Sequence, residues 1–242
     1  MNTNNNLDNI DNIDNINENM GKLVVLSGPA GSGKGTVLKE LFNLAEYKYS
    51  VSATTRTPRD GETEGVDYYF LQKEDFLRKV SSGDMLEYVE YSGNYYGTLR
   101  DPVERMLRKG YNVILEIEVI GALNIKEKFP GAVMIFLTPP NYSELSERLI
   151  NRGTETDEII ARRLEIAKKE VVCVEKYDYL VINENNMQKR AAFNIHCIVE
   201  TEKHKNIQPK SMSREIEIMS KTAEENKITL KSAEDFLNIY FS

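Results

Sequence analysis

The chain has 242 residues, of which 40% are hydrophobic and 29% are charged, which is enough for one α/β domain with appendages. A net charge of −7 argues against duplex nucleic acid as the main partner, because neutralising phosphates requires a basic surface. Cys173 and Cys197 suggest neither a disulfide framework nor a metal site, no run approaches a membrane span, and no basic-then-apolar leader opens the chain. We therefore expect a cytoplasmic protein with no nucleic acid and no membrane among its partners.

The first 20 residues, MNTNNNLDNIDNIDNINENM, repeat the triplet Asp-Asn-Ile from Asp8, Asp11 and Asp14 and contain no Lys or Arg. Asn and Asp favour turns and local side-chain bonding over helix, and the isoleucines are too few to form a core alone. This composition predicts a disordered low-complexity leader with no chemistry of its own over residues 1–20.

From Lys22 onward, short apolar runs alternate with segments of helical periodicity. Runs that are apolar on both faces are typical of parallel strands covered by helices on both sides. We predict a doubly wound α/β fold, with a five-stranded parallel sheet flanked by helices. The predicted strands are 22–27, 49–53, 111–118, 132–137 and 179–182, and the predicted helices are 37–46, 101–109, 142–151 and 157–176.

The stretch SGPAGSGKGT, residues 27–36, joins the first predicted strand to the first predicted helix. Gly28 to Lys34 match the phosphate-loop pattern G-x-x-x-x-G-K-[ST] up to its lysine. Glycines let the backbone curl so that several N–H groups face phosphate oxygens, and the helix N-terminus adds partial positive charge. We therefore expect a nucleotide site in which Lys34 binds the β- and γ-phosphates.

Gly35 departs from this pattern, because a Ser or Thr at that position coordinates Mg²⁺ in many such loops. We expect the Thr36 hydroxyl to bond a phosphate oxygen rather than to replace the metal ligand. The metal is then expected to be bound mainly by phosphate oxygens and water, with nearby carboxylates orienting those waters.

Residues 54–97 interrupt the alternation and are rich in Thr, Gly, Tyr and charge, which predicts a small inserted subdomain. Arg56 and Arg59 lie three residues apart in it, and arginine forks match phosphate oxygens in a bidentate way. Tyr68 and Tyr96 are able to donate phenolic hydrogen bonds to the same anion. The combination indicates a phosphate site rather than separate surface side chains.

Two acidic residues, Glu116 and Glu118, end the predicted strand 111–118. Alternation along a strand places both on one face, and ligands of open α/β sheets bind beyond the carboxyl ends of the strands. Two acids on an apolar strand are costly without a function, so we expect both in the site.

Beyond about residue 205 the sequence predicts two short helices, in SMSREIEIMSKTAEENK and SAEDFLNIY. Ser232 and Asp235 have the spacing of a capping box at the start of the second one. Acids and bases balance in this extension, residues 206–242, and no chemistry is evident in it. It either packs on the core, mediates assembly, or has no role.

Three long motifs follow one another along the chain. They are Thr54-Thr55-Arg56-x-x-Arg59-x-x-Glu62-x-x-Gly65-x-x-Tyr68-x-Phe70-Leu71, then SGNYYGT at 92–98, then NRGTETDEIIARRL at 151–164. Together they resemble the guanylate kinases, a family of P-loop nucleoside monophosphate kinases that pass the γ-phosphate of ATP to GMP. The resemblance spans residues 21–205, and it implies a mixed-β GMP-binding subdomain at 54–98 and a helical lid at 145–165.

The resemblance also implies the roles of individual residues. Glu87 would accept from guanine N1–H and the 2-amino group, a paired donor edge that adenine lacks, and Ser52 would face O6. Glu118 would reach the guanine amine, although the family has Leu-Asp-Ile-Asp-x-Gln-Gly where this chain has Leu-Glu-Ile-Glu-Val-Ile-Gly. The full implied GMP set is Ser52, Arg56, Arg59, Tyr68, Glu87, Tyr96, Thr98 and Glu118.

On the ATP side, the resemblance implies the loop residues, an adenine contact and the lid arginines. Glu116 would orient the water shell of Mg²⁺, which binds with ATP. The implied ATP set is Gly28, Pro29, Ala30, Gly31, Ser32, Gly33, Lys34, Gly35, Thr36 and Asn183. The implied catalytic set is Lys34, Arg148, Arg152 and Arg163.

No protein nucleophile is needed for this chemistry, because a phosphate oxygen of GMP, or of dGMP, attacks in line while cations spread the developing charge. Two alternatives stay open. One is a kinase for AMP or dTMP, against which the arginine pair and Glu87 argue. The other is a non-catalytic peptide-binding module, which typically has a degraded phosphate loop. The expected assembly is a monomer or a homodimer.

Overall fold

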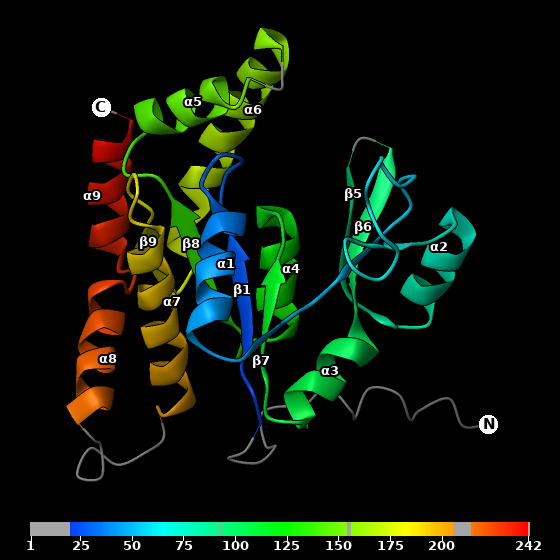
Figure 1. Cartoon of the computed structure of the whole chain (residues 1–242), viewed down its shortest axis with the longest axis horizontal. Helices are drawn as coiled ribbons and strands as arrows, with labels where there is room; N and C mark the ends of the chain where they lie inside the picture. Colours follow the sequence, from blue (N-terminus) through cyan, green and yellow to red (C-terminus); the bar gives the residue numbers. More distant parts are fainter. Residues whose placement is uncertain (1–19, 92, 154–155, 206–213, 242) are drawn as a thin grey trace.

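Five short apolar segments form one parallel sheet at the centre of the molecule (Figure 1). The computed structural model describes residues 20–91, 93–153, 156–205 and 214–241. The strands are β1 Leu23–Ser27, β2 Tyr47–Tyr49, β7 Asn112–Glu116, β8 Val133–Thr138 and β9 Tyr179–Ile182. Their order is β2-β7-β1-β8-β9, and all four pairings are parallel. The predicted α/β fold with a five-stranded parallel sheet is confirmed.

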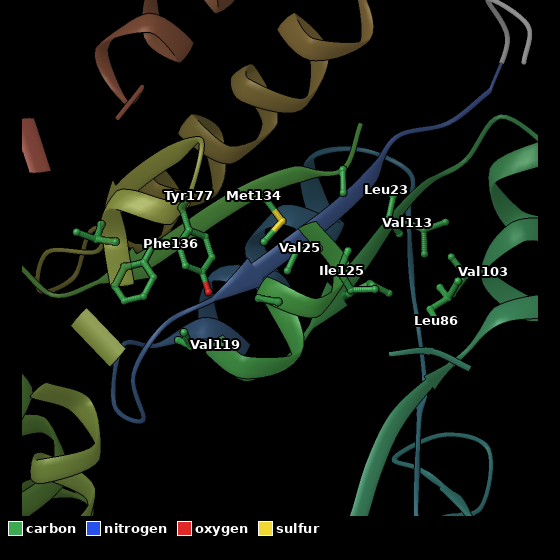
Figure 2. Close-up of a cluster of buried hydrophobic side chains, with 14 of the residues drawn as sticks. Leu23, Val25, Leu86, Val103, Val113, Val119, Ile125, Met134, Phe136 and Tyr177 are labelled. Carbon is green, nitrogen blue, oxygen red and sulfur yellow. The ribbon is translucent and has the colours of Figure 1, made fainter. Parts of the chain in front are cut away.

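Helices cover both faces of this sheet because the side chains of β1 alternate. Leu23 and Val25 enter one buried cluster (Figure 2), and Val24 and Leu26 enter the other. The first face is covered by α3 Arg100–Arg108, α4 Val119–Lys128, α6 Asp157–Val171 with the 3-10 turn η1 Val172–Lys176, and α9 Leu230–Tyr240. The second face is covered by α1 Lys34–Leu44, α7 Gln188–Lys203 and α8 Arg214–Glu225.

The helix α5, Tyr142–Asn151, extends beyond the carboxyl ends of the strands together with the start of α6 (Figure 1). Its first turn is capped by Asn141, whose side chain accepts from the backbone N–H of Glu144 at 2.8 Å. The predicted helix over 157–176 is α-helical only to Val171 and ends in the 3-10 turn. Part of the predicted lid, residues 154–155, lies outside the described residues.

A second, smaller sheet forms the inserted part of the chain. Its strands are β3 Ser52–Thr54, β4 Tyr69–Phe70, β5 Met85–Tyr91 and β6 Asn94–Leu99, in the order β4-β3-β6-β5. The β3–β4 pairing is parallel and the other two are antiparallel, so the sheet is mixed as predicted. The helix α2, Lys73–Ser81, packs on it through the buried Phe76.

The prediction of one strand over 49–53 is wrong, because that segment contributes to both sheets. Tyr49 ends β2 in the central sheet and Ser52 begins β3 in the small one. The chain therefore leaves the core and enters the insert within a few residues. The helix α2 was not predicted, since it is short and mostly polar and Phe76 is its only buried residue.

The C-terminal extension packs on the core. Both predicted helices are present as α8 and α9, while residues 206–213 and the leader at 1–19 lie outside the described residues. The predicted capping box of Ser232 and Asp235 is wrong, because α9 begins earlier. Its N-cap is Thr229, whose hydroxyl accepts from the Ser232 N–H at 3.1 Å, and Ser232 is the third helical residue. Over the residues that the structure describes, no helix is both long and apolar enough to cross a membrane.

Candidate active site

The loop between β1 and α1 has the backbone shape that a phosphate loop requires. Gly28, Gly31 and Gly33 have φ values of 148°, 89° and 88°, a region that residues with a Cβ rarely adopt. A Cβ on Gly28 would lie 2.0 Å from the carbonyl oxygen of Leu137, so the loop also approaches β8 more closely than any other residue type permits. The predicted residues Gly28 to Thr36 therefore form one continuous turn that leads into the N-terminus of α1.

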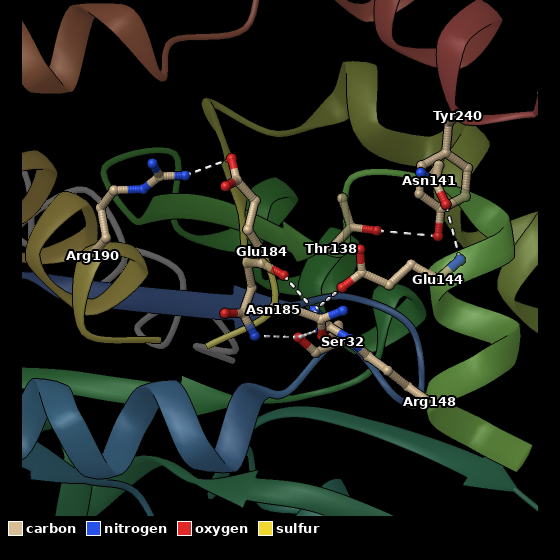
Figure 3. Close-up of polar contacts among 10 residues, drawn as sticks. Ser32, Thr138, Asn141, Glu144, Arg148, Glu184, Asn185, Arg190 and Tyr240 are labelled. Atoms are coloured by element: carbon tan, nitrogen blue, oxygen red, sulfur yellow. Dashed lines mark hydrogen bonds and ion pairs between the residues drawn. The ribbon is translucent and has the colours of Figure 1, made fainter. Parts of the chain in front are cut away.

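Two side chains from distant segments bind the backbone of this loop at Ser32 (Figure 3). The Asn183 amide Nδ2 donates to the Ser32 carbonyl at 2.8 Å, and the Arg148 guanidinium donates to the same oxygen at 3.5 Å. Arg148 also donates to the Asn183 carbonyl at 2.7 Å and pairs with Glu144. The buried Asn183 thus lies beneath the loop, and the structure assigns it and Arg148 a supporting contact that the sequence did not indicate.

Lys34 lies at the start of α1 with its ammonium turned back onto the loop. Its Nζ donates to the carbonyls of Gly28 at 2.6 Å and Pro29 at 3.3 Å. Burial lowers the pKa of Lys34, and the nearby carboxylates, chiefly that of Glu116, act in the opposite direction. The amine is therefore close to the loop, partly desolvated, and surrounded by acids that favour its charged form.

The next two positions differ: the space beside Gly35 is open, and the Thr36 hydroxyl is bonded to the loop itself. A Cβ on Gly35 would meet no atom within 4 Å, so no neighbour excludes a side chain at the position where the usual hydroxyl is missing. The Thr36 hydroxyl donates to the Gly33 carbonyl at 2.8 Å.

Three carboxylates lie within electrostatic reach of Lys34, from Glu116, Glu118 and Glu170. The prediction that Glu116 and Glu118 share one strand face is wrong, because β7 ends at Glu116 and Glu118 occupies the N-cap position of α4. Burial raises the pKa of Glu116, which accepts from the Tyr49 hydroxyl at 3.5 Å. Glu170, from α6, was not predicted. Burial and the neighbouring Glu118 raise its pKa to about 7.

In the inserted part, Arg56 is oriented by an acid and two aromatic rings. Its guanidinium donates to both carboxylate oxygens of Glu62, at 2.9 and 2.8 Å, and lies 5.4 Å from the centroid of the Tyr68 ring. Tyr68 in turn contacts Tyr96 edge to face, with 6.2 Å between ring centroids. The Arg59 side chain is exposed, and its backbone N–H donates to Glu62 at 2.8 Å. The structure thus brings Arg56, Tyr68 and Tyr96 together, and the Arg59 backbone is bonded to the same Glu62 that pairs with Arg56.

Three residues of the predicted base pocket lie side by side across adjacent strands. Ser52 of β3 is opposite Thr98 of β6, and Thr98 is opposite Glu87 of β5, so the three side chains share one face of the small sheet. The Thr98 hydroxyl donates to the Glu87 carboxylate at 2.8 Å. Glu87 is only 3% exposed, and burial raises its pKa to about 7 against the effects of the Thr98 bond and of Lys128.

Gly121 is a residue of this pocket that the sequence analysis missed. It lies in the first turn of α4, and a Cβ there would come within 2.7 Å of the Glu87 carboxylate oxygen. The absence of a side chain therefore makes room for a buried carboxylate between the small sheet and the core. Gly121 is the final glycine of the motif quoted above, but its approach to Glu87 is not evident from the sequence, since the two residues are far apart in the chain.

The lid arginines differ in their surroundings. Arg148 is bound beneath the loop, whereas Arg152 ends α5 as an exposed residue within electrostatic reach of Lys34. Arg163 is half-buried on α6. The structure thus arranges most of the predicted residues in one group around the loop and a second group on the small sheet. Glu118, predicted for the second group, instead precedes α4 within electrostatic reach of Lys34.

A family model described as guanylate kinase matches residues 20–202 of the chain. The chain belongs to the guanylate kinase family. Guanylate kinases of Streptococcus pneumoniae and Streptococcus mutans are 50% and 51% identical to it over 184 residues, which is 75% of this chain and 88% and 87% of theirs. The crystal structure of the guanylate kinase from Anaplasma phagocytophilum superimposes with a TM-score of 0.61 and 31% identity, covering 84% of this chain and 95% of that one. The resemblance and the class of nucleoside monophosphate kinase are confirmed.

Gly121→Ala is expected to weaken GMP binding selectively. The added methyl group would lie 2.7 Å from the Glu87 carboxylate, which must then move away from its Thr98 partner. We expect the KM for GMP to rise about tenfold, with the KM for ATP unchanged. Glu127→Ala, an exposed change on the same helix, is the matched control. An unchanged KM for GMP would show that the position of this carboxylate does not matter to the acceptor.

The raised pKa of Glu87 predicts a pH-dependent stability. Because the pKa rises from 4.5 to about 7 on folding, the folded state binds this proton more tightly. The stabilisation is fully present below about pH 4.5 and is lost as the pH rises through about 7. The free energy of unfolding of the wild type, relative to Glu87→Gln, should therefore fall by on the order of 3 kcal/mol between about pH 4.5 and 8.

Urea denaturation across this pH range measures the effect of Glu87. Glu90→Gln, an exposed change on the same strand, is the control, and its difference from the wild type should not vary with pH in this way. A constant difference for Glu87→Gln would mean that this carboxyl does not titrate differently in the folded and unfolded states.

Proposed function

We propose that this chain transfers the γ-phosphate of ATP to GMP, giving ADP and GDP, by in-line attack of a GMP phosphate oxygen. This is the known activity of the guanylate kinase family, to which the chain belongs. The observation that carries the proposal is the row Ser52–Thr98–Glu87 on the small sheet, in the same chain as a complete phosphate-loop backbone. These features support a donor site for a triphosphate and an acceptor site for a guanine base in one chain.

On the donor side, residues Gly28 to Thr36 surround the phosphates of ATP with backbone N–H groups, and the N-terminus of α1 adds positive charge. The Lys34 ammonium exchanges its bonds to the Gly28 and Pro29 carbonyls for bonds to phosphate oxygens. Asn183 and Arg148 support the loop at Ser32, so the loop keeps its shape while the ligand binds. Asn183 is also the proposed contact to adenine.

On the acceptor side, Arg56, Arg59, Tyr68 and Tyr96 bind the GMP phosphate. Arg56 is already oriented by Glu62, so fewer rotamers have to be lost on binding. The ionised carboxylate of Glu87 accepts from guanine N1–H and the 2-amino group, while Ser52 faces O6, Thr98 lines the pocket and Glu118 reaches the amine. Adenine offers no such pair of donors, and this favours guanine. The proposal extends to dGMP as a second acceptor.

The lid contributes charge at the transferring phosphoryl group. Arg152 and Arg163, together with Lys34 and Arg148, spread the charge that develops in the transition state. Closure of the lid over residues 145–165 and of the GMP subdomain over 54–98 excludes water, which otherwise competes as acceptor. In this division, residues 21–205 are the kinase domain, 1–20 a leader and 206–242 an extension.

Mg²⁺ is the proposed cofactor, and when bound it would supply positive charge that offsets the charge of the ATP phosphates. Among the described residues, no three His, Cys, Asp or Glu side chains come close enough to bind a metal by themselves. Gly35 offers no hydroxyl, and the nearby Glu116 carboxylate faces Lys34. These residues fit a Mg²⁺ ion that is bound by phosphate oxygens and water, with Glu116 bonding to the water.

The proposed protein is a monomer or homodimer of the cytoplasm.

Production of ADP from ATP that depends on GMP is the direct test of the function. We expect turnover with GMP that exceeds turnover with AMP or dTMP by at least about 100-fold. Lys34→Ala should lower kcat by about 100-fold or more, because the ammonium stabilises charge in the transition state. Lys39→Ala, an exposed lysine on the same helix, is the control and should be as active as the wild type. A wild type with no GMP-dependent turnover would overturn the proposal and favour a binding module.

Glu116→Gln is expected to lower kcat about tenfold and to raise the Mg²⁺ concentration needed for half-maximal ATP binding, measured by calorimetry. The amide keeps the shape of the side chain but loses the charge that orients the water. Gly35→Ser is the matched change on the loop, and it should leave ATP binding largely intact because a Cβ there meets no neighbour within 4 Å. The same Mg²⁺ dependence for Glu116→Gln and wild type would remove Glu116 from the metal's surroundings.

A further inference from the structure

The C-terminal extension lies beyond residues 20–202, the part that matches the family model, yet it enters the core. Tyr240, near the end of α9, is only 1% exposed and belongs to the same buried cluster as Phe136 and Tyr177. The segment before α9 also bonds to the edge strand β9. The Asn226 carbonyl accepts from the Leu180 N–H at 2.8 Å, and the Ile228 N–H donates to the Asp178 carbonyl at 2.9 Å. The extension is therefore part of the folded unit.

The polar end of Tyr240 contacts the last residue of β8. The Thr138 hydroxyl donates to the Tyr240 hydroxyl oxygen at 3.2 Å, and Thr138 is fully buried (Figure 3). Burying two hydroxyls is unfavourable unless they bond to each other, so this contact defines where α9 lies along the strand end. Phe241 adds a ring contact to Tyr142, the first residue of α5, at 6.0 Å between centroids.

This strand end is connected to the phosphate loop. The Thr138 carbonyl accepts from the Asn183 backbone N–H at 2.8 Å. The Asn183 side chain donates to the Ser32 carbonyl of the loop at 2.8 Å. Two hydrogen bonds thus separate Thr138 from the loop. The short connection after Thr138 leads through Asn141 to α5, which carries Arg148.

We propose that α9 is a positioning element for the ATP side of the site. Tyr240, through its bond to Thr138, sets the position of the β8 end. Asn183, which supports the phosphate loop, is bonded to that end, and α5 begins shortly after it. The small sheet that carries the GMP residues lies on the far side of the molecule from α9 (Figure 1). The extension therefore acts on ATP binding and not on GMP binding. This inference rests on the proposed function for the identity of the two ligands.

The test compares Tyr240→Phe, Thr138→Val and the double variant. Each removes the hydroxyl bond and keeps most of the buried volume. We expect each single variant to raise the KM and the calorimetric Kd for ATP about three- to tenfold, with the KM for GMP within about twofold of the wild type. The double variant should be no worse than the singles, because all three lose the same bond.

The matched control is Ala223→Gly in α8. Ala223 is buried in the cluster on the other sheet face, and glycine weakens a helix interior, so this change loosens the extension without touching Thr138. It should lower the midpoint of urea unfolding but leave the KM for ATP within about twofold of the wild type.

Two outcomes would overturn the inference. One is an unchanged ATP Kd in Tyr240→Phe, which would mean that the hydroxyl only stabilises the docked helix. The other is a parallel rise of the KM values for ATP and GMP in Tyr240→Phe and in Ala223→Gly, which would mean general loosening. Failure of the proposed function is distinguishable, since it appears as a wild type without GMP-dependent turnover, whereas the ATP Kd is measured without turnover.

Discussion

The carbonyl oxygen of Ser32 is the point on which the ATP side of this protein depends. A phosphate loop exposes its N–H groups to the ligand, so its carbonyls must find donors elsewhere. The Asn183 amide and the Arg148 guanidinium both donate to this oxygen, and they come from the end of β9 and from α5. The loop, the edge of the sheet and the base of the lid therefore share one set of hydrogen bonds.

The acceptor side depends on a different constraint, the burial of a carboxylate. Glu87 is almost fully enclosed, and its pKa of about 7 reflects the cost of keeping a charge there. The Thr98 hydroxyl and the charge of Lys128 offset part of that cost, and the missing side chain at Gly121 leaves room for the carboxylate. A group balanced between its neutral and charged forms is consistent with the proposed guanine pocket, because two hydrogen bonds from the base would complete the stabilisation of the charge.

Much of the fold and many of the site residues were predictable because the requirements are local in sequence. The runs that form β1, β7, β8 and β9 are apolar on both faces, and only a strand covered on both sides explains such runs. The glycine spacing of the loop follows from its φ values. The prediction of one strand over 49–53 was wrong because its residues pair with two different sheets. The predicted start of α9 was wrong because Thr229, and not Ser232, is the N-cap.

The sequence by itself determined the fold class, the phosphate loop and the family, since periodicity, glycine placement and motif spacing are properties of neighbouring residues. Only the tertiary structure decided the surroundings of Glu87, the approach of Glu170 to Lys34 and the bond between Thr138 and Tyr240. Each of these joins segments that are far apart in the chain. Such contacts depend on how the sheet orders its strands and on which helices cover each face, and no local pattern encodes that.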